Sequence, residues 1–170
     1  MHDDVRSVVQ DSNGVFWIGT LEGVSRYDGK TFTSFSKADG LLSSEIFASL
    51  LDREGYLWFS TYQEGVCRYA GQTWTSFTTG DGLAHNAVSS MLQDRNGRMW
   101  FGTLSGGVSC YDGQTWTTWT HQDGLGSNFI HTLFEDQNGH MWFGSSEGAT
   151  RYDGQIFQTL TAEDGLVDDY

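Results

Sequence analysis

Short runs of alternating apolar and polar residues recur four times along this chain, each time with the same order of turns and aromatic rings. Tryptophan and tyrosine each hold one repeated position: Trp17, Trp58, Trp100 and Trp142, and Tyr27, Tyr69, Tyr111 and Tyr152. The spacing of about 42 residues lies in the range in which one supersecondary structure is repeated side by side. The chain is therefore predicted to be a repeat protein with four copies of one element.

Each copy contains four short stretches with the alternation and the aromatic and β-branched content of strands. In the first copy they cover residues 5–10, 16–20, 24–27 and 31–35. The turn after the first stretch contains Asn-Gly in three of the four copies, and Asn-Gly is a strong hairpin signal because both residues tolerate positive φ. Every copy is therefore predicted to form four antiparallel strands joined by hairpins.

A lone four-stranded sheet of this kind cannot bury both of its apolar faces, whereas sheets stacked radially can. The predicted fold class is all-β, a β-propeller of four-stranded antiparallel blades with four blades in the chain. Residues 1–170 are expected to form a single propeller domain or half of a propeller. The expected blades cover approximately residues 5–36, 46–78, 88–120 and 130–161.

Three finer features of the repeat lead to structural expectations. Small residues after the tryptophan, such as Gly19 and Gly102, indicate a place where a neighbouring backbone comes close. The rings of the fourth strand stand three residues apart, as at Phe32 and Phe35, so we expect a bulge or a strand end between them. The aspartate of a repeated Asp-Gly-Leu is expected to accept hydrogen bonds from nearby backbone amides: Asp39, Asp81, Asp123 and Asp164.

The whole copy reads Asp-x-x-Gly-x-x-Trp-Phe/Ile-Gly-Thr, then Gly-Val-x-Arg-Tyr-Asp-Gly, and closes with Asp-Gly-Leu. This pattern resembles the two-component regulator propeller repeat of bacterial sensor proteins, over nearly the whole chain. Copies two and three depart from it at Ser60, Ala70 and Cys110. The resemblance implies an extracytoplasmic, ligand-sensing propeller, followed in full-length members by other domains and a histidine kinase. The family's repeated motif is structural, so the resemblance implies no catalytic residue.

Composition and charge exclude several classes of partner. The chain has 22 glycines, no proline and a formal net charge of −13. Nucleic acid is not an expected partner, because the nine lysines and arginines form no basic stripe against this charge. A membrane is not expected either, because no apolar run approaches the roughly 18 residues of a spanning helix. The acidic start at residues 1–4 predicts no signal peptide, so a periplasmic or extracellular location is only what the resemblance implies.

The thiols and titratable groups predict no catalytic, metal or cofactor site. Cys67 and Cys110 lie one strand position out of phase, so we expect buried free thiols on opposite faces of their own sheets. The Asp-x-Asn-Gly turns lack the ligands of a calcium loop. The histidines show no metal-ligand spacing: His2, His85, His121, His131 and His140. The repeated tryptophans are expected to pack in the core, and no enzymatic activity is predicted.

Function is expected where the four copies differ. The loops between second and third strands and the linkers into first strands should gather at one end of the ring, as sites on repetitive scaffolds do. Candidate ligand-binding residues on them are Glu22, Tyr62, Gln63, Glu64, His85, Asn86, Ser105, Ser127, Asn128 and Glu147. Their phenol, amide and carboxylate groups suit a polar ligand such as a carbohydrate.

The same interblade linker occurs near both ends of the chain, at residues 2–5 and 164–169, as in a section of a longer array. Small residues midway along the first strands permit the close inner packing of a larger ring: Ser7, Ala48, Ser90 and Thr132. We expect a head-to-tail homodimer with eight blades, because heterologous contacts close into rings. A self-closed ring of four blades is the alternative.

Two other functions stay open beside ligand sensing. One is a repeat scaffold, natural or engineered, that assembles into a closed ring without a dedicated ligand. The other is a lyase-type propeller enzyme, which needs histidine, arginine and glutamate side chains converging on the channel-facing loops. The sequence offers only His85 and Glu64 there.

Overall fold

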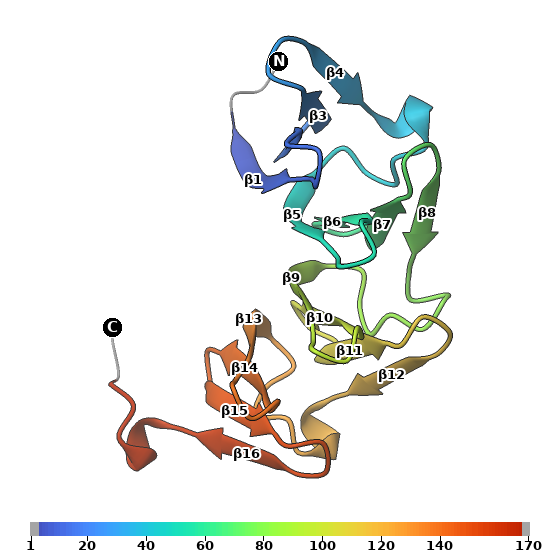
Figure 1. Ribbon diagram of the computed structural model, residues 1–170. Coiled ribbons are helices and arrows are strands. Elements are labelled where there is room, and N and C mark those ends of the chain that lie inside the picture. The colour runs from blue at the N-terminus through green and yellow to red at the C-terminus, as the bar shows by residue number, and fades with distance from the viewer. Residues whose placement is uncertain (1–3, 168–170) are drawn as a thin grey trace. The chain divides into compact units, whose positions relative to one another are not determined.

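The computed structural model describes residues 4–167, and within them four separate antiparallel sheets of four strands follow one another (Figure 1). In each sheet the strands lie side by side in the order of the chain. The predicted fold class, all-β with four four-stranded propeller blades, is confirmed.

The strands lie close to the predicted stretches, and the blades are numbered in chain order. Blade 1 contains β1 (Val5–Gln10), β2 (Phe16–Thr20), β3 (Gly23–Tyr27) and β4 (Phe32–Phe35). Blade 2 contains β5 (Ile46–Leu51), β6 (Leu57–Thr61), β7 (Val66–Tyr69) and β8 (Trp74–Phe77). Blade 3 contains β9 (Val88–Gln93), β10 (Met99–Thr103), β11 (Val108–Tyr111) and β12 (Trp116–Trp119). Blade 4 contains β13 (Ile130–Glu135), β14 (Met141–Ser145), β15 (Gly148–Tyr152) and β16 (Phe157–Leu160).

The chain divides into two compact units, Met1–Val88 and Ser89–Tyr170. Unit 1 contains blades 1 and 2, and unit 2 contains blades 3 and 4 apart from Val88, the first residue of β9. Each unit therefore has a core of its own between two neighbouring sheets. In the part of the chain that the structure describes, no helix has the length and apolar character needed to cross a membrane.

The strand register defines two faces in each blade, because residues paired across neighbouring strands point to the same side. Trp17 and Gly19 lie on one side, which we call the Trp face, together with their partners on β3. Phe16 and Tyr27 pair directly and lie on the other side, which we call the Tyr face. The same two faces exist in the other three blades.

Within each unit the Trp face of one blade packs against the Tyr face of the next. The ring centroids of Trp17 and Tyr69 are 5.1 Å apart in unit 1, and those of Trp100 and Phe143 are 5.9 Å apart in unit 2. Trp17 is 3% and Trp100 is 0% exposed. The predicted position of the tryptophan between adjacent sheets is confirmed for these two residues. Trp142, on the Trp face of the last blade, is only half-buried.

One hydrogen bond explains why aspartate and tryptophan stand six residues apart in every copy. The aspartate that begins the first hairpin turn accepts a bond from the indole Nε1: Asp11 from Trp17 (3.0 Å), Asp52 from Trp58 (2.7 Å), Asp94 from Trp100 (2.9 Å) and Asp136 from Trp142 (3.1 Å). The same carboxylates accept backbone amides of the turn, as from Val15 in blade 1. The repeated aspartate therefore closes the turn and orients the core tryptophan.

The expected role of the aspartate in Asp-Gly-Leu is confirmed. Asp39 accepts the backbone amide of Ser36 over 2.8 Å, and a capping box results in which Ser36 and Asp39 hydrogen-bond to each other's backbone amides. Asp81, Asp123 and Asp164 accept equivalent bonds. In three copies this segment forms a single-turn 3-10 helix: η1 (Lys37–Asp39), η2 (His121–Asp123) and η3 (Ala162–Asp164).

The bulge or break expected in the fourth strand is wrong for β4, which pairs continuously with β3 from Phe32 to Phe35. Phe32 stacks on Tyr27 on the Tyr face, whereas Phe35 lies on the Trp face. A spacing of three residues thus places the two rings on opposite faces of an unbroken strand. The irregular pairing lies in the first strand instead, at Val5–Ser7, Ile46–Ala48 and Ile130–Thr132.

A close approach at the small residues is confirmed, but the neighbouring atoms belong to side chains and not, as predicted, to the backbone. A Cβ added to Gly19 would lie 2.5 Å from Ile46 Cγ2, and one added to Gly102 would lie 2.7 Å from Ile130 Cγ2. Both isoleucines are 1% exposed and begin the first strand of the next blade. The isoleucine side chain of the next blade therefore occupies the space that a Cβ at this position would need.

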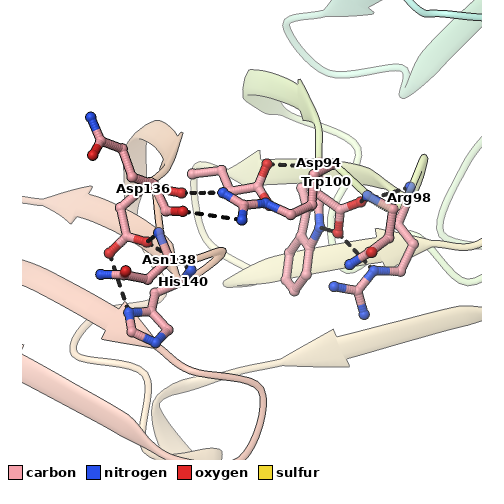
Figure 2. A network of polar contacts seen from close by, with 10 residues as sticks. Asp94, Arg98, Trp100, Asp136, Asn138 and His140 are labelled. Carbon is pink, nitrogen blue, oxygen red and sulfur yellow. Dashed lines mark hydrogen bonds and ion pairs between the residues drawn. The ribbon is translucent and has the colours of Figure 1, made fainter.

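Blades 3 and 4 are also joined by polar contacts between their first hairpin turns (Figure 2). Arg95 Nε donates to Glu135 over 2.8 Å, and the guanidinium also donates to the carbonyl oxygens of Asp136 and Gln137. A guanidinium with several acceptors in fixed directions gives strong, geometrically specific bonds. In blade 1 the position of Arg95 is held by Ser12, so this contact does not recur in unit 1.

Both cysteines are buried free thiols on opposite faces, as expected. Cys67 pairs with Phe59 on the Tyr face of blade 2, and Cys110 pairs with Trp100 on the Trp face of blade 3. Burial raises the pKa of both thiols, that of Cys110 to about 12.

Candidate functional site

In both units the loop between the second and third strands of a blade meets the linker that follows that blade. Gly65 N–H donates to the carbonyl oxygen of Asn86 over 2.9 Å in unit 1, and Gly107 N–H donates to that of Asn128 over 2.9 Å in unit 2. The two regions in which the copies differ most in sequence therefore lie side by side.

A cavity of about 410 Å³ opens beside this contact in unit 2, between blades 3 and 4. It is lined by Leu104, Ser105, His121, Ser127, Asn128, Phe129 and Glu147. Four of these residues, Ser105, Ser127, Asn128 and Glu147, are candidates predicted from the sequence. The volume lies within the range of about 300–1,000 Å³ that is typical of small-molecule sites.

Two hydrogen bonds position the polar side chains of the cavity. Ser127 Oγ donates to Glu147 Oε1 over 3.1 Å, and the backbone N–H of His121 donates to Asn128 Oδ1 over 2.7 Å. Because the oxygen of the Asn128 amide is engaged, its NH₂ group is the side that can donate to a ligand. The second carboxylate oxygen of Glu147 can accept. The cavity therefore offers a donor and a charged acceptor.

Phe129 supplies an apolar wall. Its side chain is 40% exposed, and its ring meets that of His131 edge-on with centroids 4.9 Å apart. The edge contact holds the orientation of the Phe129 ring and leaves much of the ring to a ligand. An aromatic surface next to polar groups suits a ligand with both apolar and hydroxyl-bearing sides.

The proton position on His121 follows from its neighbours. Its Nδ1 lies 3.0 Å from the carbonyl oxygens of both Leu125 and Gly126. Carbonyl oxygens only accept hydrogen bonds, so Nδ1 carries a proton. Nε2 is then the ring nitrogen left to contact a ligand.

The equivalent place between blades 1 and 2 is spanned by an ion pair. Lys37 stands at the position of His121, and Glu64 stands at the position of Glu147. Lys37 Nζ lies 2.9 Å from both carboxylate oxygens of Glu64. The carboxylate is therefore engaged by a cation in unit 1, whereas in unit 2 it is held by a serine hydroxyl.

The structure places the other sequence-predicted candidates on loops of unit 1. Glu22 lines a separate cavity of about 190 Å³ at the end of blade 1. His85 Nδ1 accepts the backbone amide of Ala87 over 3.0 Å, and Asn86 Oδ1 accepts that of Thr79 over 2.9 Å, so both side chains hold the linker. The exposed residues of the loop between β6 and β7 are Tyr62, Gln63 and Glu64.

Sequence reasoning missed three residues that line the unit 2 cavity, namely Leu104, His121 and Phe129. The sequence singles out His121 only as one of five histidines that lack metal-ligand spacing. A usable signal exists in the repeat itself. The junction between blades 1 and 2 has Lys37 and Glu45 at the positions that His121 and Phe129 occupy between blades 3 and 4. The change from charged to aromatic side chains at these repeated positions indicates that the junction between blades 3 and 4 differs from the junction between blades 1 and 2.

The arrangement is suited to binding. Over residues 4–167, no group of three histidine, cysteine, aspartate or glutamate side chains is placed to hold a metal ion. Ser127 donates to a carboxylate but is only 4% exposed, so its hydroxyl orients Glu147 and is poorly placed to attack a substrate.

A family model described as the two component regulator propeller matches residues 1–22, 40–63, 82–105 and 124–147. These segments cover more than half of the chain and recur once in each copy of the repeat. This chain belongs to the two component regulator propeller family. No curated protein matches its sequence.

The fold of this two component regulator propeller is similar to solved structures of larger proteins. The extracellular domain of BT4673 from B. thetaiotaomicron, assigned to the hybrid two component systems, is 19% identical with a TM-score of 0.80, over 98% of this chain and 27% of that one. The corresponding domain of BT3049 from the same organism is 24% identical with a TM-score of 0.56, over 97% of this chain and 29% of that one. The chain thus spans little more than a quarter of the length of these domains.

A propeller enzyme shares the fold as well. Virginiamycin B lyase from Staphylococcus aureus is 12% identical with a TM-score of 0.75, over 93% of this chain and 55% of the enzyme. At such identities the likeness shows a common fold only. The function of this two component regulator propeller must be inferred from its own residues.

Proposed function

We propose that this chain is a non-catalytic, ligand-binding module of a sensor, and that the cavity between blades 3 and 4 takes a small polar ligand such as a carbohydrate. The observation that carries the proposal is the difference between two equivalent junctions. Lys37 neutralises Glu64 in unit 1, whereas the Glu147 carboxylate in unit 2 faces a cavity.

The chemistry of the lining favours a sugar over a charged ligand. The Glu147 carboxylate can accept from a sugar hydroxyl, the Asn128 amide can donate to one, and the Phe129 ring can pack against the C–H face of a pyranose. An anionic ligand would be repelled by Glu147 and by the net charge of −13.

The structural relatives support a location outside the cytoplasm. The domains of BT4673 and BT3049 are described as extracellular domains of hybrid two component systems. The chain's own membership of the two component regulator propeller family, together with this likeness in fold, supports an extracytoplasmic ligand as its signal.

A lyase-type activity is the weaker alternative. The similarity to virginiamycin B lyase concerns the fold at 12% identity. The cavity supplies His121 and Glu147 on its loops, but none of its lining residues is an arginine. If the chain is a repeat scaffold without a ligand, no compound should bind it selectively. A binding screen therefore distinguishes the scaffold hypothesis from the sensor hypothesis.

Binding is tested by a glycan array followed by calorimetry with the best oligosaccharide. We expect Glu147→Gln and Phe129→Ala each to weaken binding at least about tenfold, which corresponds to about 1.4 kcal/mol. Glu64→Gln is the matched control, because it alters the equivalent residue of blade 2, and it should leave the affinity unchanged. No binder across oligosaccharides and small polar metabolites, or equal effects of the Glu147 and Glu64 variants, would refute the proposal.

A further inference from the structure

Exposed apolar side chains gather on two sheet faces of the described residues. On the Tyr face of blade 1, Val5, Val8, Phe16 and Phe32 are 51%, 57%, 40% and 66% exposed. On the Trp face of blade 4, Phe134 is 61% exposed. The linker after that blade adds Leu166 at 42% and Val167 at 82%. We call these the open faces of blades 1 and 4.

Two of these positions, those of Val5 and Phe16, are buried in the blades that have a neighbour on the Tyr face. Ile46 and Leu57 stand at the positions of Val5 and Phe16 in blade 2, and they are 1% and 4% exposed. In blade 4, Met141 stands at the position of Phe16 and is 2% exposed. The open Tyr face of blade 1 therefore corresponds to a face that packs against a neighbouring blade within each unit.

We propose that the open Trp face of blade 4 binds the open Tyr face of blade 1 of a second copy of this chain, in a head-to-tail homodimer that makes this contact twice. The inference goes beyond ligand binding and does not depend on it. The chain's own contacts between blades 1 and 2 and between blades 3 and 4 serve as the template.

A cavity on blade 4 matches an exposed side chain on blade 1. In unit 1, Ile46 fills the space beside Gly19. At the equivalent glycine of blade 4, Gly144, an added Cβ would meet only Thr132 of the same blade, and Gly144 lines a cavity of about 580 Å³. Val5 is the residue equivalent to Ile46 and is one methylene smaller, so it fits beside Gly144 of the second copy.

The linker after blade 4 can make the contacts of the other linkers. The leucine of Asp-Gly-Leu is 3% exposed at Leu41 and 0% at Leu125, but 42% at Leu166. The next backbone N–H donates to a third-strand side chain of the following blade, from Leu42 to Cys67 Sγ and from Gly126 to Thr150 Oγ1, each over 3.1 Å. In blade 1 that third-strand position is Ser25, whose hydroxyl can accept the N–H of Val167 from the second copy.

The buried area favours a closed pair over a single contact. At about 150–200 Å² for a fully exposed apolar or aromatic side chain, the seven exposed residues amount to roughly 700 Å² per contact. Two contacts reach roughly 1,400 Å², inside the range of about 1,200–2,000 Å² for stable interfaces. A heterologous contact forms a ring when its rotation closes, and a ring of two copies would satisfy both open faces of each chain.

The particle mass in solution is the first test. Native mass spectrometry and light scattering at micromolar concentration should give twice the chain mass of 19.0 kDa. Because each copy carries a net charge of −13, pairing should strengthen when the salt concentration is raised. A monomer at both low and high salt would overturn the proposal.

A mixing experiment tests the head-to-tail arrangement. Val5→Asp disables one open face and Phe134→Asp the other, so each variant alone should be monomeric. An equimolar mixture should form a two-chain particle through the one intact pair of faces, at a higher protein concentration than the unaltered chain requires, because that single contact buries about half of the area. Both residues are exposed in the single chain, so circular dichroism should show unchanged folding. Pairing by Val5→Asp alone, or no pairing in the mixture, would overturn the proposal.

Two further variants separate assembly from ligand binding. Tyr62→Asp introduces the same charge at a residue that is 46% exposed but belongs to neither open face, and it should still pair. Phe129→Ala, which is expected to weaken sugar binding, should also keep the doubled mass. Loss of pairing in either variant would count against the assigned faces, whereas loss of sugar binding alone would not.

Discussion

The indole nitrogen of Trp100 donates a 2.9 Å hydrogen bond to Asp94, and the two side chains are 0% and 1% exposed. Burial by itself raises the pKa of Asp94, but hydrogen bonds from Trp100 and Arg98 outweigh it and hold the pKa below its usual value. An ionised carboxylate is thus buried beside the core ring that joins blades 3 and 4. The buried charge of Asp94 is tolerated only because Trp100 and Arg98 donate hydrogen bonds to it.

Trp100→Phe should therefore be strongly destabilising. The variant removes the donor to a buried carboxylate and also leaves part of the indole volume empty. We expect the free energy of unfolding to fall by about 2–4 kcal/mol, measured by urea denaturation followed by circular dichroism. Trp142→Phe is the matched control, compared in the unpaired Phe134→Asp background, in which the Trp face of blade 4 stays uncovered. Because Trp142 is half-buried on an open face, Trp142→Phe should lower the free energy of unfolding by less than Trp100→Phe does. An equal decrease would contradict this account of the core.

Acid should destabilise the fold in a defined pH window. The hydrogen bond from Trp142 is the main cause that lowers the pKa of Asp136 from 3.8 to about 2. A lowered pKa contributes stability that is complete above the ordinary value and is lost as the pH falls through the lowered one. Stability should therefore decline from about pH 4 to about pH 2. Urea titrations should show a shallower decline for Asp136→Asn, and an unchanged slope would contradict the assignment.

Gly19→Ala tests the contact between neighbouring blades. The new methyl group would meet Ile46 Cγ2 and Ser7 Oγ, each at 2.5 Å, so a buried strand must shift. We expect a loss of about 1–3 kcal/mol in the free energy of unfolding. Gly80→Ala is the control, because its added Cβ would have only Thr78 Oγ1 nearby at 3.4 Å. Equal stability of the two variants would show that the blades do not pack as described.

The contact between Arg95 and Glu135 can be measured by a double-mutant cycle. Arg95→Ser and Glu135→Leu reproduce the residues of unit 1, Ser12 and Leu51. Since the Arg95 side chain is 46% exposed and that of Glu135 13%, we expect a coupling of about 0.5–1 kcal/mol. A coupling of zero would show that the turns of blades 3 and 4 are not held together by this pair.

Thiol chemistry should report on folding. Because burial raises the pKa of Cys110 to about 12 and also raises that of Cys67, little thiolate forms at neutral pH. Iodoacetamide should leave both thiols unmodified in the native chain and alkylate both in urea, as counted by mass spectrometry. Rapid labelling of either thiol in the native state would contradict its burial.

The sequence by itself determined the blades. Trp17 and its counterparts mark a repeated unit whose two apolar faces cannot be buried within one sheet. The Asp-x-x-Gly and Asp-Gly turns mark where strands end, so alternation and turn chemistry are enough to predict the strand positions. These signals are local: hairpins pair residues close in the chain. Spacing failed at Phe32 and Phe35, because it does not say which face each ring occupies until the strand pairing is known.

Only the tertiary structure decided which loops form a cavity and which close it. Glu64 and Glu147 occupy the same repeated position, yet one is paired with Lys37 and the other faces a cavity beside Phe129, because their partners lie on a neighbouring blade. Likewise, Val5 and Ile46 are equivalent in the repeat, and only the stacking of sheets leaves one exposed and buries the other. Burial depends on what a neighbouring sheet brings into contact, and a repeat period alone does not contain that information.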